Sequence, residues 1–118
     1  MISYQGSCHC GAVRFRFESE PITTAVQCNC SICIRKNAIM SDAYYRPEDF
    51  ELLSGEDALN VYHFGDHDVN HHFCKTCGIY PFHDSIYEPG KYRINLGCVE
   101  GVEPRELNIR EYDGRTLL

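Results

Sequence analysis

Hydrophobic and polar residues alternate most clearly over residues 12–18, where Val13, Phe15 and Phe17 occupy every second position and charged residues lie between them. This period of two is typical of a β-strand with one buried face. Six further segments are rich enough in β-branched and aromatic residues to be predicted as strands, namely 23–27, 39–45, 59–64, 71–73, 79–83 and 92–96.

Helical signals are confined to two short segments. Residues 31–36 predict a single helical turn with Ser31 as its N-cap, and residues 47–50 predict another with Pro47 at the first helical position. Polar turn signals occur at residues 54–57, 65–66, 88–90 and 113–114. Short strands separated by such turns predict a mainly β protein.

Length and charge narrow the function classes. The 118 residues predict a single domain spanning 1–118. Acidic residues number 17 and basic residues 11, and the resulting net charge of −6 argues against binding to nucleic acid or to an anionic membrane surface. Residues 1–7 have neither the basic start nor the apolar segment of a secretory signal, so we expect a cytoplasmic location.

Cysteines are the strongest feature of the chain. There are eight, and seven of them lie in three tight clusters: Cys8 and Cys10; Cys28, Cys30 and Cys33; Cys74 and Cys77. Two cysteines separated by one or two residues in a tight turn can both reach one zinc ion, which binds sulfur at about 2.3 Å in a tetrahedron. Gly11 and Gly78 follow the second cysteine of their clusters, where such a turn often needs a positive φ.

The first and third clusters together predict a closed structural zinc site. Its ligands would be Cys8, Cys10, Cys74 and Cys77, which join two turns more than sixty residues apart. The alternative is two local disulfides. It is disfavoured because a Cys-x-Cys disulfide is strained and the cytoplasm is reducing.

The middle cluster has a different character because Ile34, not glycine, follows Cys33. Cys28, Cys30 and Cys33 predict a second zinc ion with three protein ligands and an open fourth position, which is the pattern of a catalytic site. The alternatives are a site closed by Cys98 or a histidine, and a redox-active trio without metal. Cys98 itself is expected to be a small buried hydrophobe.

Three motifs give the chain a resemblance to a known family. They are the segment from Gly6 to Val13 around Cys8-His9-Cys10, Cys28-x-Cys30-x-x-Cys33, and His72-Phe73-Cys74-x-x-Cys77-Gly78. The chain resembles the glutathione-dependent formaldehyde-activating enzyme family, whose domain is also found in centromere protein V, over about residues 6–104. It departs from the family at residues 34–37, which lack a glycine that many members carry.

The resemblance implies a β-tent-like fold of short antiparallel strands around the closed zinc site. It also implies two zinc ions with the ligands assigned above, one structural and one catalytic. The implied activity is the condensation of glutathione with formaldehyde, a reaction classed with those of carbon–sulfur lyases.

The predicted chemistry is therefore the zinc-assisted addition of glutathione, or a similar thiol, to formaldehyde or another small aldehyde. Zinc held by three thiolates favours a fourth soft ligand, and coordination removes the proton of an incoming thiol. Four cationic residues are candidates for binding the carboxylates of the thiol: Arg35, Arg93, Lys36 and Arg46.

Other functional interpretations of the same residues remain open. One is a non-catalytic zinc-stabilised module that binds proteins or carries zinc. Another is a redox switch built from Cys28, Cys30, Cys33 and Cys98. Tyr44, Tyr80 and Tyr92 are expected to be core or rim aromatics, and the histidines are expected to be structural rather than catalytic.

Overall fold

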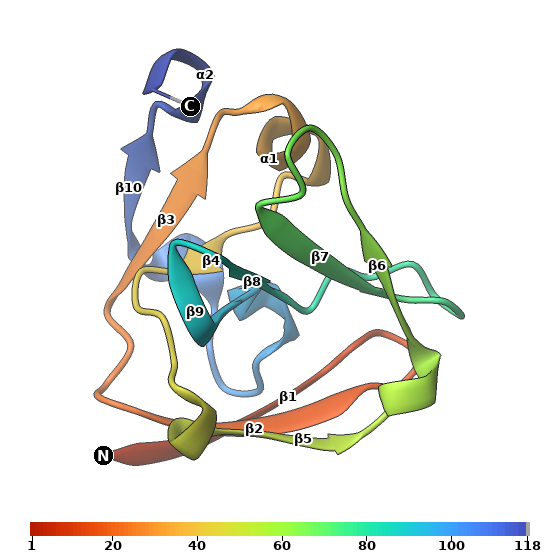
Figure 1. The fold of residues 1–118 in the computed structure, drawn as a ribbon. Helices are drawn as coiled ribbons and strands as arrows, with labels where there is room; N and C mark the ends of the chain where they lie inside the picture. The colour runs from red at the N-terminus through yellow and green to blue at the C-terminus, as the bar shows by residue number, and fades with distance from the viewer. Residues whose placement is uncertain (118) are drawn as a thin grey trace.

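The computed structural model describes residues 1–117 and confirms a mainly β protein of short strands (Figure 1). The first sheet is antiparallel and has the order β1 (Ile2–Ser7), β2 (Arg14–Ser19), β5 (Phe50–Ser54). The alternation predicted for β2 is confirmed, because Phe15 and Phe17 are fully buried while Arg14 is exposed.

The largest sheet contains four antiparallel strands in the order β6 (Leu59–Tyr62), β7 (Val69–Cys74), β8 (Phe82–Ser85), β9 (Glu88–Ile94). The register of β7 and β8 places His71 opposite His83. This pairing brings two histidines together on one face of the sheet, a point of importance for the second cysteine cluster.

A third sheet has the order β10 (Asn108–Tyr112), β3 (Thr24–Cys28), β4 (Met40–Ser41). Strands β10 and β3 are parallel, and this pair is an exception to the expected antiparallel arrangement. Parallel neighbours need a long crossover connection. Here most of the chain separates the two strands, which Figure 1 shows side by side near the C-terminus.

The core lies between the first sheet and the four-stranded sheet and is largely aromatic. The ring of Phe82 meets the rings of Phe15 and Phe50 edge to face, with centroids 5.6 and 5.2 Å apart. Such pairs add to the stabilisation that comes from burying the rings. The core therefore links the two sheets whose turns carry Cys8, Cys10, Cys74 and Cys77.

Two short helices are present, α1 (Ser31–Lys36) and α2 (Gly114–Leu117). The extent of α1 is as predicted, but its N-cap is Cys30, and Ser31 is already helical. The predicted turn after Arg46 is a 3₁₀ turn over Pro47–Asp49. No helix among residues 1–117 is long and apolar enough to cross a bilayer.

Several strand boundaries differ from those predicted. Strands β1, β5 and β10 were not predicted, and the segment 39–45 forms only the two-residue strand β4. Strand β9 begins at Glu88, inside a predicted turn, and ends at Ile94. Strand β8 begins at Phe82, three residues later than predicted. The strands at the rim pair through backbone groups and bury few side chains, so hydrophobic alternation marks them poorly.

Candidate functional site

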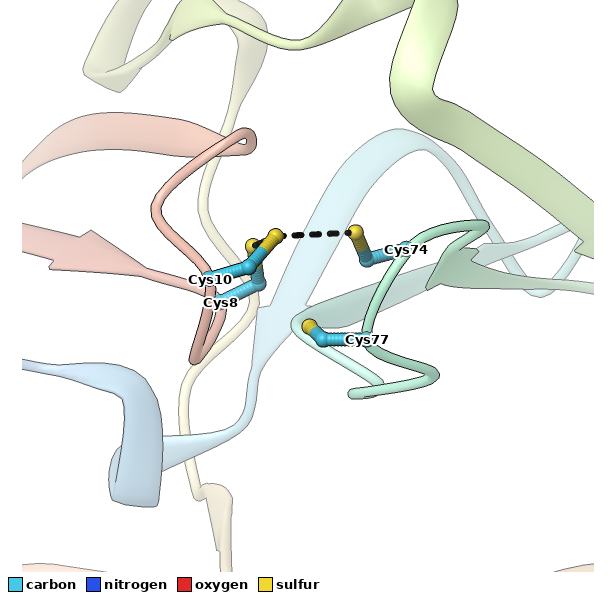
Figure 2. Close-up of side chains that lie close together, drawn as sticks. All are labelled: Cys8, Cys10, Cys74 and Cys77. Carbon is cyan, nitrogen blue, oxygen red and sulfur yellow. Dashed lines mark hydrogen bonds between the residues drawn. The ribbon is translucent and has the colours of Figure 1, made fainter.

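The first and third cysteine clusters meet in space, as predicted. Cys8 and Cys10 lie in the turn between β1 and β2, and Cys74 and Cys77 lie at the end of β7 and in the turn that follows (Figure 2). Their four sulfur atoms lie within 4.8 Å of one another. Figure 2 shows the sulfurs of the two turns facing each other across a short gap.

The sulfur–sulfur distances match a tetrahedral metal site. Cys10 Sγ lies 3.6 Å from Cys8 Sγ and 3.7 Å from Cys74 Sγ. Four sulfurs at about 2.3 Å from one zinc ion would be separated by about 3.8 Å, whereas a disulfide needs about 2.05 Å. All eight cysteines of the described chain are free thiols. The cluster can therefore hold a metal ion, and its geometry is compatible with zinc.

The backbone of both turns is shaped around these sulfurs. Gly11 and Gly78 have φ values of 83° and 78°, which confirms the positive φ predicted after the second cysteine. The Val13 amide donates to Cys8 Sγ at 3.3 Å. The amides of Cys10 and Ile79 lower the pKa of the Cys77 thiol to about 6. Backbone N–H groups thus favour thiolates, the form that binds metal.

The second cluster lies where β3 ends and α1 begins. The sulfurs of Cys28, Cys30 and Cys33 lie within 4.8 Å of one another. Within residues 1–117, no further histidine, cysteine or carboxylate ligand joins this group. The three thiols can therefore hold a metal ion while leaving a coordination position free for another ligand.

The charges of the second cluster favour a bound cation. Burial acts to raise the pKa of Cys30, but hydrogen bonds from the amide and thiol of Cys33, the thiol of Cys28 and the amide of Ile32 together outweigh it, and the net pKa is lowered. Burial also raises the pKa of Cys33 to about 12, and the neighbouring thiolates add to this effect. Thiolates this close repel each other, and a bound divalent cation removes that repulsion.

A buried lysine stands beside the second cluster. Lys36 is the last residue of α1, and its Nζ lies 4.0 Å from the centre of the Tyr80 ring. This ammonium is buried without a hydrogen-bond partner. Burial lowers the pKa of Lys36, while Cys33 and the other thiolates act to raise it. A negatively charged metal–thiolate group would supply the missing counter-charge, so the residues present fit a metal at this cluster.

Tyr80 connects Lys36 to the two paired histidines. Its hydroxyl lies 2.5 Å from His71 Nδ1 and 2.9 Å from His83 Nδ1. A single hydroxyl has one proton, so it donates to one ring and accepts from the other. Sequence reasoning missed this group, because the contact between His71 and His83 is created by the register of β7 and β8.

The buried histidines predict a loss of stability in acid. Burial, with Lys36 second, lowers the pKa of His71 to about 4 and that of His83 to about 2. Below about pH 6.5 the unfolded chain binds protons at these rings and the folded chain does not, so the free energy of unfolding falls as pH falls. His71 alone should contribute roughly 3 kcal/mol of this loss between pH 6.5 and 4.

Urea unfolding in excess zinc at a series of pH values tests this expectation. His71→Gln should flatten the slope between pH 6.5 and 4, whereas His9→Gln, at an exposed position, should leave it unchanged. Comparing variants at each pH removes the pH dependence of metal binding itself. An unchanged slope in His71→Gln would contradict the expected role of His71.

The candidate cationic residues occupy different places. Arg93 stacks on Tyr44, with its Cζ 4.2 Å from the ring centre, and donates from Nη2 to the Asp42 carbonyl. Arg35 is exposed on α1 and donates to the Ser31 carbonyl. Arg46 is paired with Asp49 at 3.0 Å, near the 3₁₀ turn. Arg93 is close enough to Lys36 that its positive charge acts to lower the pKa of Lys36.

Cys98 is not part of the second cluster. It is partly buried against the core, and burial raises its pKa to about 12, with smaller effects from Cys8 and Cys77. Its nearest thiol neighbours thus belong to the first site. Cys98 packs against the core as a small hydrophobe is expected to, although it is only partly buried, and the geometry does not favour a redox switch that joins Cys98 to Cys28, Cys30 and Cys33.

The sequence model of the glutathione-dependent formaldehyde-activating enzyme family matches residues 3–111. The chain belongs to this family. A crystal structure of a Rhodobacter sphaeroides protein is similar to the chain at a TM-score of 0.78 and 37% sequence identity, covering 90% of this chain and 99% of that one.

Membership of the formaldehyde-activating enzyme family confirms the resemblance drawn from the cysteine motifs. The structure also accounts for the departure after Cys33. Asn37 ends α1 in the left-handed conformation at φ 52°, with its amide bonded to the Cys33 carbonyl at 2.9 Å. Asparagine tolerates this conformation better than most residues, so the turn forms without glycine.

Proposed function

We propose that the protein is a zinc-dependent enzyme of the carbon–sulfur lyase type. It would add glutathione, or a similar thiol, to formaldehyde or another small aldehyde. Family membership supports this class of activity. The observation that carries the proposal is the three-thiol cluster of Cys28, Cys30 and Cys33, open at a fourth position and next to the buried ammonium of Lys36.

Two zinc ions are proposed per chain. Cys8, Cys10, Cys74 and Cys77 would hold a structural ion between two sheets, and Cys28, Cys30 and Cys33 would hold a catalytic one. When bound, the second zinc supplies an open, soft coordination position at which an incoming thiol is kept deprotonated. We further propose that residues 1–118 form one zinc-binding domain that works in the cytoplasm and binds neither nucleic acid nor membrane.

The residues around the second cluster suit a negatively charged thiol. Lys36 contributes a buried positive charge, and Arg93 contributes a second one nearby. Arg35 lies at the exposed surface of α1, where it can reach a carboxylate of a bound glutathione. A hollow of about 360 Å³ borders the cluster at Cys28 and is within the size range of small-ligand sites, but Glu111 and Asp113 also line it, so the positive charge for an anionic thiol comes from outside this hollow.

Cobalt substitution tests the proposal directly. A protein loaded with Co²⁺ should change its visible spectrum when glutathione is added, because the thiolate becomes the fourth sulfur at the second site. S-methylglutathione is the matched control, since it has the same charges but no free thiol, and should leave the spectrum unchanged. A spectrum indifferent to glutathione would instead support a non-catalytic zinc-stabilised module.

A further inference from the structure

The buried donors that lack a partner gather in one place. Among the side chains of residues 1–117 that are not exposed, the buried nitrogen or oxygen atoms without a hydrogen-bond partner are Lys36 Nζ, His71 Nε2 and Arg93 Nε. A buried polar group without a partner costs about 1–3 kcal/mol, and a charged group costs more. Three such atoms in one region indicate a missing ligand rather than three separate defects.

Contacts among the surrounding rings show that these atoms share one region. Lys36 lies over the ring of Tyr80, whose hydroxyl contacts His71 and His83. The ring centroids of His83 and Tyr44 are 6.5 Å apart, and the guanidinium of Arg93 lies over the Tyr44 ring. The region borders the second cysteine cluster, because the thiolate of Cys33 acts on the charge of Lys36.

The chemistry of the orphaned atoms defines the missing ligand. Lys36 Nζ and Arg93 Nε are cationic donors without an acceptor. An oxygen atom that carries, or develops, negative charge would give these donors an acceptor, in addition to the counter-charge that a metal–thiolate group gives Lys36. The sulfur atom of a thiol bound at the cysteine cluster is not such an oxygen, so the oxygen comes either from a carboxylate of that thiol or from a second substrate with a carbonyl group.

The charges around the second cysteine cluster limit the second substrate, which is the molecule to which the thiol adds, to a neutral one. Lys36 and Arg93 are positive, and a zinc ion with three thiolates has a charge of about −1. The carboxylate of Asp42 is paired with Arg110 at 2.7 Å. Asp84 is paired with His72 at 2.7 Å, on the face of β8 opposite to His83. One incoming thiolate sulfur balances the remaining positive charge at the reacting centre, and the carboxylates of glutathione would pair with Arg35 at the exposed surface, so a second anion at the centre is disfavoured.

We propose, building on the function above, that Lys36 binds the carbonyl oxygen of a small neutral aldehyde and stabilises the oxyanion that forms there. The thiolate sulfur bonds to the carbonyl carbon, and the π electron pair of the carbonyl moves onto oxygen. The oxygen takes a proton from the Lys36 ammonium, and the proton that the thiol lost on entry restores it. Tyr80, held by His71 and His83, positions the ammonium.

The test uses formate, a one-carbon carboxylate that resembles the oxyanion, as a probe. Calorimetric titration of the zinc-loaded protein should detect formate binding, and Lys36→Met should weaken it by at least roughly tenfold. Lys91→Met is the matched control, since this lysine is paired with Glu88 and should bind formate as the wild type does. Equal binding by wild type and Lys36→Met, or no binding at all, would overturn the proposal.

Kinetics give a second measurement. Lys36→Met should reduce the turnover of formaldehyde and glutathione by about 100-fold, the effect expected for loss of an oxyanion-binding donor, while Lys36→Arg should recover part of it. The wild type should prefer formaldehyde to glyoxylate, because glyoxylate adds a second negative charge. A preference for glyoxylate would refute the charge argument. If Lys36→Met does not fold, Lys36→Gln provides the same comparison.

The outcomes separate this inference from the proposed function. If the cobalt spectrum responds to glutathione but Lys36→Met binds formate as tightly as the wild type, the proposed thiol chemistry stands and the role of Lys36 is refuted. Formate binding that depends on Lys36, with a spectrum indifferent to glutathione, would support the oxyanion site and refute the thiol chemistry.

Discussion

Replacement of Cys74 by serine is expected to unfold the protein. Cys74 is fully buried, and its sulfur lies 3.7 Å from that of Cys10 in the turn of another sheet. Structural zinc sites contribute about 10–16 kcal/mol of apparent binding free energy, which equals or exceeds the net stability of a typical domain. Circular dichroism and zinc content per chain should show a disordered protein that retains little metal.

Cys98→Ser is the matched control for this experiment. Cys98 is also partly buried and lies near Cys8 and Cys77, but it is not part of the four-sulfur group. The variant should fold and keep both metal ions. A Cys74→Ser protein that melts like Cys98→Ser would show that the four-cysteine cluster does not hold the two sheets together through a metal.

Replacement of Cys30 by serine is expected to have the second-largest effect, on activity rather than on folding. Cys30 precedes the six-residue helix α1, and its cluster joins only β3 to that helix. Loss of one of three ligands should release the second metal and reduce activity by at least about 100-fold, since even residues behind the ligands can cost that much. Metal analysis should find a folded chain with one zinc ion fewer.

Comparison of the two cysteine variants tests the division of roles. Cys74→Ser should lose structure together with metal, and Cys30→Ser should lose metal and activity alone. If both variants unfold to the same extent, the assignment of one structural and one reactive site is wrong. If Cys30→Ser keeps full activity with one zinc ion fewer, the second metal is not part of the chemistry.

Much of the first site could be predicted from local sequence. Short spacing indicates that two thiols share one turn, as in Cys8 and Cys10 and in Cys74 and Cys77. The glycine that follows each pair predicts the positive φ that the turn adopts. Both are properties of a few neighbouring residues. The alternation around Phe15 and Phe17 is local in the same sense, so β2 was predicted almost at its observed position.

Strand pairing and the surroundings of the second cluster are not local properties. The parallel pairing of β10 with β3 joins segments about 80 residues apart, and no periodicity in either segment reports it. Tyr80 was expected to be a core or rim aromatic because its contact with Lys36 comes from α1, which is distant in sequence, and its contact with His71 depends on how the turn after β7 folds back. Arg35 and Arg93 looked equivalent in the sequence, yet the first is exposed and the second is stacked on Tyr44.

The sequence by itself thus determined the family, the mainly β class and the grouping of seven cysteines, because thiol spacing and short-range alternation act within a few residues of backbone. Only the tertiary structure decided what stands next to the open three-thiol cluster. Whether a polar atom is buried without a hydrogen-bond partner depends on every segment packed around it. The buried charge of Lys36, the pairing of His71 with His83 and the position of Cys98 are therefore fixed only when the sheets are assembled.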